Sequence, residues 1–97
     1  MKSIFIAFDQ AYLEQILVVL STNHVRGYTE WESVKGKGSK TGEPHLGSHA
    51  WPSQNSSIMT IVEDEKVKKI LSDLKTLNAT SDQMGLRAFV WNIEDGM

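Results

Sequence analysis

Two stretches of the chain carry apolar residues at the spacing of a helix face, and they limit the folds that the chain can adopt. The first face consists of Leu13, Ile16, Leu17 and Leu20. The second face consists of Val67, Ile70, Leu71, Leu74 and Leu77. Both follow the i, i+3, i+4, i+7 pattern of an amphipathic helix, and Asp9 and Asp64 precede them as predicted N-caps. The sequence therefore predicts two helices that each bury one face.

Four shorter segments favour β-structure and flank these helices. In the first, Ile4, Ile6 and Phe8 alternate with Phe5 and Ala7, so both faces are apolar, as in a strand covered on both sides. The other three are rich in β-branched and aromatic residues. The predicted strands are Ser3–Phe8, Gly27–Val34, Ser56–Val62 and Leu86–Ile93.

These segments follow one another as strand, helix, strand, long loop, strand, helix, strand. A chain of 97 residues forms one domain, residues 1–97. We expect an α+β, ferredoxin-like βαββαβ fold, in which a four-stranded antiparallel sheet carries both helices on one face. The other face would expose Phe5, Phe89 and Trp91, and a bare apolar patch of this kind favours self-association. Trp31 and Trp91 are expected in the core or at an interface.

The segment between the second and third strands has neither helix nor strand patterning. Residues 36–55 form the predicted long flexible loop, and loops longer than about 12–15 residues in a small domain are usually functional or disordered. Residues 27–55 include Trp51, two closely spaced histidines and three lysines among glycines. This composition predicts a loop that responds to a ligand rather than a linker.

The composition excludes several classes of function. A formal net charge of −2 argues against coating nucleic acid, which needs a concentrated basic face. The absence of cysteine excludes disulfides, thiolate metal sites and a cysteine nucleophile. The apolar run before Asp9 is too short for a signal-peptide core, and no run approaches the ~18 apolar residues of a membrane span. We expect a cytoplasmic protein that neither inserts into a membrane nor binds nucleic acid.

Several groups of residues resemble motifs of a known family. They are Gly27–Thr29, Val34–Gly38, Val62–Val67 and Leu86–Val90. Over nearly its whole length the chain resembles the PII signalling family and its PII-like relatives. The resemblance implies a non-catalytic homotrimer that binds small effectors, often adenine nucleotides, in clefts between subunits. It also implies that the long loop contacts a target protein.

Three features differ from classical members of that family. The long loop lacks the tyrosine-bearing segment that classical members modify covalently. The loop Thr80–Arg87 has Gly85 as its only glycine, and Arg87 stands where classical members have a lysine that meets phosphates. The C-terminal arginines of classical members are absent. The chain therefore resembles a divergent PII-like group rather than a classical nitrogen sensor.

The segment Lys35–Lys40 predicts contact with an anion. Its lysines lie among glycines whose backbone can turn N–H groups toward a phosphate, although the GxxxxGK[ST] order of a P-loop is absent. Arg87 is the best distant partner because its planar fork suits phosphate geometry. The alternative is a solvated, positively charged loop base. With the resemblance, the predicted effector site consists of Thr29, Gly36, Lys37, Gly38, Gly85 and Arg87.

A second candidate site is a metal site in the long loop. The four-residue gap between His45 and His49 suits a divalent ion such as zinc or copper, and Glu43 offers a third donor. Other subunits would complete such a site, with candidates Glu30, Glu32 and His24. Alternatively, both histidines are solvent-exposed or form hydrogen bonds within the loop.

The loop also carries a candidate partner contact, and the chain lacks a recognisable catalytic pattern. Trp51 and Pro52 form a predicted hydrophobic tip for a partner protein, with packing against the trimer as the alternative. No Ser-His-Asp spacing is recognisable, so we do not expect an enzyme. The first hypothesis is a PII-like homotrimer that binds a nucleotide or an anion and regulates a transporter or an enzyme through its long loop. The alternative is a metal-sensing protein that uses His45 and His49.

Overall fold

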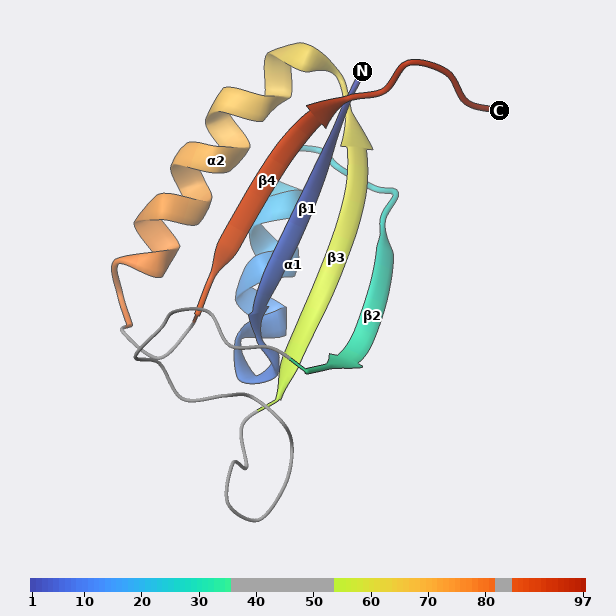
Figure 1. The fold of residues 1–97 in the computed structure, drawn as a ribbon. Coiled ribbons are helices and arrows are strands. Elements are labelled where there is room, and N and C mark those ends of the chain that lie inside the picture. Colours follow the sequence, from blue (N-terminus) through green and yellow to red (C-terminus); the bar gives the residue numbers. More distant parts are fainter. Residues whose placement is uncertain (36–53, 82–84) are drawn as a thin grey trace.

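The computed structural model describes residues 1–35, 54–81 and 85–97 (Figure 1). The elements in chain order are β1 (Lys2–Asp9), a short 3-10 turn η1 (Gln10–Tyr12), α1 (Leu13–Thr22), β2 (Thr29–Val34), β3 (Asn55–Val62), α2 (Asp64–Asn78) and β4 (Arg87–Asn92). The predicted order of helices and strands is confirmed, and the strand boundaries differ from the predicted ones by at most two residues. The 3-10 turn between β1 and α1 was not predicted.

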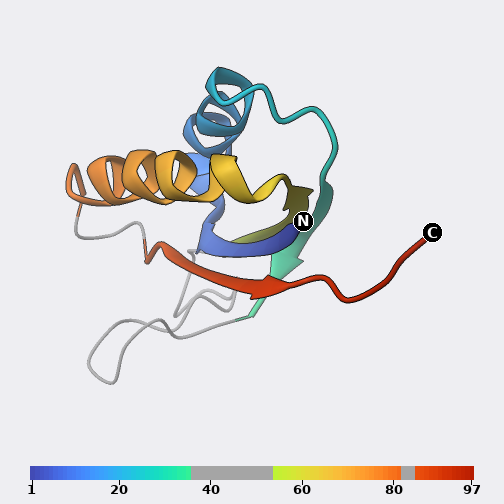
Figure 2. The same ribbon diagram turned by 90° about the horizontal axis from the view of Figure 1, so that it is seen from above.

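The four strands form one antiparallel sheet in the order β2-β3-β1-β4. Figure 2 shows both helices on the same face of this sheet. The predicted ferredoxin-like α+β fold is therefore confirmed. Neither of these helices is long and apolar enough to cross a membrane, as far as the described ranges extend.

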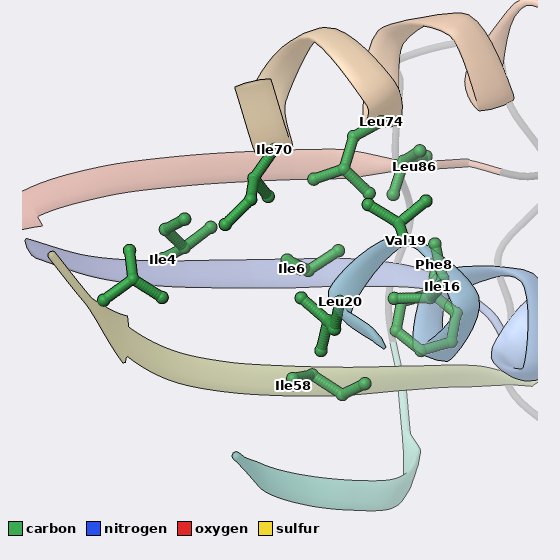
Figure 3. Close-up of a cluster of buried hydrophobic side chains, with 11 residues drawn as sticks. Ile4, Ile6, Phe8, Ile16, Val19, Leu20, Ile58, Ile70, Leu74 and Leu86 are labelled. Carbon is green, nitrogen blue, oxygen red and sulfur yellow. The ribbon is translucent and has the colours of Figure 1, made fainter. Parts of the chain in front are cut away.

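The hydrophobic core lies between the sheet and the two helices (Figure 3). On β1, Ile4, Ile6 and Phe8 are fully buried, because alternate residues of a strand point to the same face. The other core residues are Ile16, Val19, Leu20, Ile58, Val62, Ile70, Leu74 and Leu86. The remaining apolar residues of the two predicted helix faces pack against this cluster and are partly buried.

The opposite face of the sheet has no helix over it and is strongly apolar. Phe5 pairs with Phe89 across β1 and β4, and Trp91 lies two residues further along β4, so the three share one face as predicted. Phe89 is 60% exposed and Trp91 is 46% exposed, and Trp31 and Ile61 are exposed to a similar degree. We call these five residues the open sheet face. Of the two positions predicted for Trp31 and Trp91, the core is excluded, because the strand alternation turns both side chains away from the helices. A position at an interface stays a prediction.

The two predicted helix caps have different outcomes. The carboxylate of Asp9 accepts a hydrogen bond from the backbone N–H of Ala11 at 2.9 Å, so Asp9 caps η1, the turn that leads into α1. The prediction for Asp64 is wrong, because Glu63 is the extended N-cap residue and Asp64 is already helical. The Asp64 carboxylate instead lies 3.0 Å from the amino group of Met1. A hydrogen bond from this amino group lowers the pKa of Asp64.

A polar contact joins the end of α1 to the middle of α2. The Asn23 side-chain amide donates to the carbonyl of Val19 at 2.8 Å and to the carboxylate of Asp73 at 2.9 Å. Hydrogen bonds from Lys69 and from Asn23 lower the pKa of Asp73. The contact fixes the direction in which the chain leaves α1.

The residue after this contact, His24, has a left-handed backbone with φ of 59°. A left-handed backbone costs a residue with a Cβ about 1–2 kcal/mol, whereas glycine adopts it freely. The His24 side chain is exposed, so its loss removes little packing. We expect His24→Gly to raise the free energy of unfolding by about 0.5–1 kcal/mol, after part of the gain is lost to the freer unfolded chain. Urea unfolding measures this change, and a lower stability than wild type would contradict it.

Candidate functional site

The loops that carry the predicted site residues meet at one end of the sheet. β1 and β2 end there, and β3 and β4 begin there (Figure 1). The strand register agrees, because Val34 and Asp9 both pair with Asn55, and Ala7 pairs with Arg87. Both flanks of the long loop therefore lie at the same end of the sheet as the segment that leads into β4.

Hydrogen bonds hold the two flanks of the long loop together. The carbonyl of Glu32 accepts from the hydroxyl of Ser56 at 2.6 Å and from the side-chain amide of Gln10 at 3.2 Å. The hydroxyl of Ser33 donates to the side-chain carbonyl of Gln54 at 2.9 Å. We call residues 32–35 and 54–56 the loop root. These polar contacts help to hold the loop root in position.

The loop root also contains an irregularity of the sheet. Trp31 pairs with Ser57, but Val34 pairs with Asn55, so β2 has one more residue than β3 over this stretch. A bulge of this kind bends a strand, raises its twist and redirects its side chains, and bulges are frequent beside functional sites.

Gly85 and Arg87 form the entry into β4. Gly85 has a left-handed backbone with φ of 59°, a conformation that favours glycine because it has no Cβ. The Arg87 side chain is exposed, and its guanidinium donates to the carbonyl of Leu86 at 2.8 Å. The guanidinium fork of an arginine carries five donors in all. Arg87 thus presents a fixed positive charge at the sheet end where the loop root lies.

A cavity of about 190 Å³ lies between α2 and β4 next to Arg87. Its lining residues are Leu71, Leu74, Lys75, Asn78, Leu86, Arg87 and Ala88. Most of the wall is apolar, and two of the seven residues carry a positive charge. No residue of α2 was among the predicted site residues.

Thr29 lies far from Arg87 within one chain. Thr29 is the first residue of β2, and β2 and β4 are the two edge strands of the sheet. Three strand spacings of about 4.8 Å separate the two edges, which is about 14 Å across the sheet. The structure therefore brings Gly85 and Arg87 together but does not bring Thr29 to them. A single ligand contacting both edges would need a second copy of the chain.

Most of the other predicted site residues lie outside the described residues. For the effector site these are Gly36, Lys37 and Gly38. For the metal site and the partner contact they are Glu43, His45, His49, Trp51 and Pro52. The proposed additional metal ligands His24, Glu30 and Glu32 are described, but no group of three or more histidine or acidic side chains in ranges 1–35, 54–81 and 85–97 is placed to hold a metal.

Sequence reasoning missed the residues of η1 and their contacts. Gln10 binds both flanks of the long loop, and the hydroxyl groups of Tyr12 and Ser81 share a hydrogen bond at 2.9 Å. The only signal in the sequence is that Gln10 and Tyr12, whose side chains can form hydrogen bonds, lie between the Asp9 cap and the apolar face of the helix. That pattern alone does not identify partners 22 to 69 residues away.

The chain matches proteins of one family by sequence profile and by fold. No curated protein matches it. Among solved structures, one match is CPII from Thiomonas intermedia K12, described as a nitrogen regulatory PII-like protein bound to ADP, AMP and bicarbonate. It is 22% identical to this chain with a TM-score of 0.78, and the match covers 95% of this chain and 84% of CPII. The apo form of CPII is 21% identical with a TM-score of 0.74, covering 95% of this chain and 87% of that one.

A second similar structure is a PII-like signaling protein, TTHA0516, from Thermus thermophilus. It is 24% identical with a TM-score of 0.72, and the match covers 95% of this chain and 85% of that one. The family model described as "Nitrogen regulatory protein P-II" matches residues 1–97. The match extends over the sheet, both helices and the loop between β2 and β3. The chain therefore belongs to the P-II family of signalling proteins.

Proposed function

We propose that the protein is a non-catalytic PII-like regulator that works as a homotrimer. In this proposal an adenine nucleotide, with or without a small anion, binds in clefts between subunits and changes the order of residues 36–55. The loop then binds or releases a transporter or an enzyme. The observation that carries the proposal is the separation of Thr29 and Arg87 on opposite edge strands, because only a neighbouring subunit can bring these two edges to one ligand.

The open sheet face supports self-association. Monomeric proteins rarely expose large contiguous apolar patches, and such patches usually mark an interface. Phe89, Trp91, Trp31 and Ile61 are all exposed on one side of one sheet. Packing of copies through this face would bury these side chains, and the edge strands at its margins would meet edges of neighbouring copies.

The chemistry at the start of β4 supports an anionic ligand. The exposed guanidinium of Arg87 can bind a phosphate through two parallel hydrogen bonds. Gly85 allows the backbone to approach a ligand closely because it has no side chain. The structures of CPII hold ADP, AMP and bicarbonate, and we transfer this ligand class to the present chain by similarity.

Regulation through the loop needs a specific energetic condition. A ligand can change the order of the loop only if it binds the two loop states with different affinity. The loop root and the Gly85–Arg87 entry lie at the same end of the sheet, with the end of β1 between them, so a ligand at Arg87 would bind at the end of the sheet where the long loop starts. The affinity of the loop for a target protein then depends on whether the cleft is occupied.

The test is ligand binding to wild-type protein and to Arg87→Ala. We expect ADP to raise the apparent stability of the wild type, by about 2.7 kcal/mol at a hundredfold excess over Kd. Loss of Arg87 should weaken ADP about 10- to 100-fold, because hydrogen bonds to charged groups contribute about 1.5–3 kcal/mol. Titration calorimetry measures this change, and unaltered thermal unfolding without ligand checks that the variant is folded.

The matched control is Arg26→Ala, which removes an exposed arginine from the loop before β2 and should leave ADP affinity unchanged. ADP affinity equal to wild type in Arg87→Ala would contradict the proposed site. A thermal shift with Zn²⁺ or Cu²⁺ but not with nucleotides, abolished by His45→Ala and His49→Ala, would instead support the metal-sensing alternative.

A further inference from the structure

The η1 turn contacts both of the segments that border the candidate site. The backbone N–H of Gln10 donates to the carbonyl of Gln54 at 2.7 Å, and its side-chain amide donates to the carbonyl of Glu32 at 3.2 Å. Gln10 therefore touches each flank of the long loop. Two residues later, the hydroxyl of Tyr12 shares a hydrogen bond with the hydroxyl of Ser81 at 2.9 Å. Ser81 belongs to the segment that leads to Gly85 and Arg87.

The turn between these contacts is short and well fixed. The carboxylate of Asp9 accepts from the N–H of Ala11 at 2.9 Å, and the N–H of Leu13 donates back to the carbonyl of Gln10. The ring of Tyr12 packs against the hydrophobic core. Gln10 and Tyr12 are therefore joined by a turn of three residues that has its own hydrogen bonds.

We propose that η1 couples the two segments, with Tyr12 and Gln10 as positioning residues. This inference rests on the proposed function. A ligand bound at Gly85 and Arg87 shifts the segment that contains Ser81, and η1 transmits this shift to the loop root. Chains of hydrogen bonds and rigid elements can carry such coupling. Because coupling between two sites is reciprocal, a target that holds the loop root changes effector affinity by the same factor.

The first test uses the ligand-free protein and hydrogen exchange at residues 32–35 and 54–56. Tyr12→Phe removes the hydroxyl and keeps the ring, and Ser81→Ala removes the other hydroxyl. A net hydrogen-bond contribution of about 0.5–1.5 kcal/mol corresponds to exchange that is about two- to tenfold faster at the loop root in both variants. Ser81→Thr, which restores a hydroxyl, should return exchange toward the wild-type rate.

Two matched controls separate coupling from general loosening. Thr80→Ala removes the neighbouring hydroxyl, which donates only within its own helix end, to the carbonyl of Leu77 at 2.7 Å. Tyr28→Phe removes the hydroxyl of an exposed tyrosine. Neither control should change exchange at the loop root. Loop-root exchange in Tyr12→Phe and Ser81→Ala equal to that of the controls would overturn the proposal.

The second test adds ADP as the probe ligand. In the wild type, saturating ADP should slow exchange at the loop root. Tyr12→Phe should bind ADP within about threefold of the wild-type affinity, since its hydroxyl is not one of the proposed ligand contacts, but should lose most of the slowing at the loop root. Full slowing in Tyr12→Phe would overturn the coupling role. Failure of the wild type to bind ADP would count against the proposed function, while the ligand-free test still decides the coupling by itself.

Discussion

Phe89→Glu is expected to convert the proposed trimer into a monomer. Phe89 lies on β4 opposite Phe5 and is 60% exposed on the open sheet face. A carboxylate placed there would have to leave water for an apolar interface without a charged partner, at a cost of several kcal/mol. A loss of about 3 kcal/mol weakens association about a hundredfold. Size-exclusion chromatography with light scattering measures the mass at micromolar concentration.

The matched control for this substitution is Val18→Glu. Val18 is 62% exposed, but it lies on α1, on the other side of the sheet from Phe89. The same charge introduced at this equally exposed apolar residue should leave the mass unchanged. A Phe89→Glu protein that keeps the wild-type mass, or a wild type that is already monomeric, would contradict assembly through the open sheet face.

Phe8→Ala is expected to lower the free energy of unfolding by about 3–5 kcal/mol. Phe8 is fully buried and is the largest such side chain in the chain as described. Figure 3 shows it among Ile16, Leu20 and other side chains of the cluster. Single domains are stable by only about 5–15 kcal/mol, so this one change removes a large part of the total. Urea unfolding followed by far-UV circular dichroism measures it.

Val18→Ala serves as the control for the core substitution, because an exposed residue outside such features usually changes stability by no more than about 0.5 kcal/mol. A loss of less than about 1 kcal/mol in Phe8→Ala would contradict the packing of β1 against α1. Both proteins should be compared at one protein concentration, since association stabilises the folded state.

The fold was predictable because two periodicities in the sequence agree with it. The alternation of Ile4, Ile6 and Phe8 matches their shared burial, and the helical spacing from Val67 to Leu77 matches the buried side of α2. These patterns report burial against a sheet, which is the main determinant of the fold. The exposed aromatic face was predictable for the same reason, because Phe5 and Phe89 occupy the opposite phase of their strands.

The local details that failed depend on contacts between residues distant in the sequence. Asp64 reads as a cap, but the amino group of Met1 lies beside its carboxylate. The partners of Gln10 and Tyr12 depend on the position of η1 after the end of β1. No local sequence pattern specifies these partners. The effector residues were assigned as one set, whereas the strand order places Thr29 and Arg87 on opposite edges. Strand order is a tertiary property that residue spacing along the chain does not determine.

The most direct test of a shared cleft is complementation between two defective subunits. Thr29→Val and Arg87→Ala chains would be produced separately and also coexpressed with different affinity tags. In a mixed cyclic trimer, one cleft combines the intact Thr29 edge of one subunit with the intact Arg87 edge of its neighbour. Random mixing then restores about a quarter of all clefts.

Titration with ADP measures the number and affinity of these clefts. We predict weak binding by each variant alone, and recovery of wild-type affinity in about a quarter of the clefts of the mixture. A mixture that binds ADP no better than the separate variants, or single variants that bind as tightly as wild type, would contradict an effector site shared between subunits.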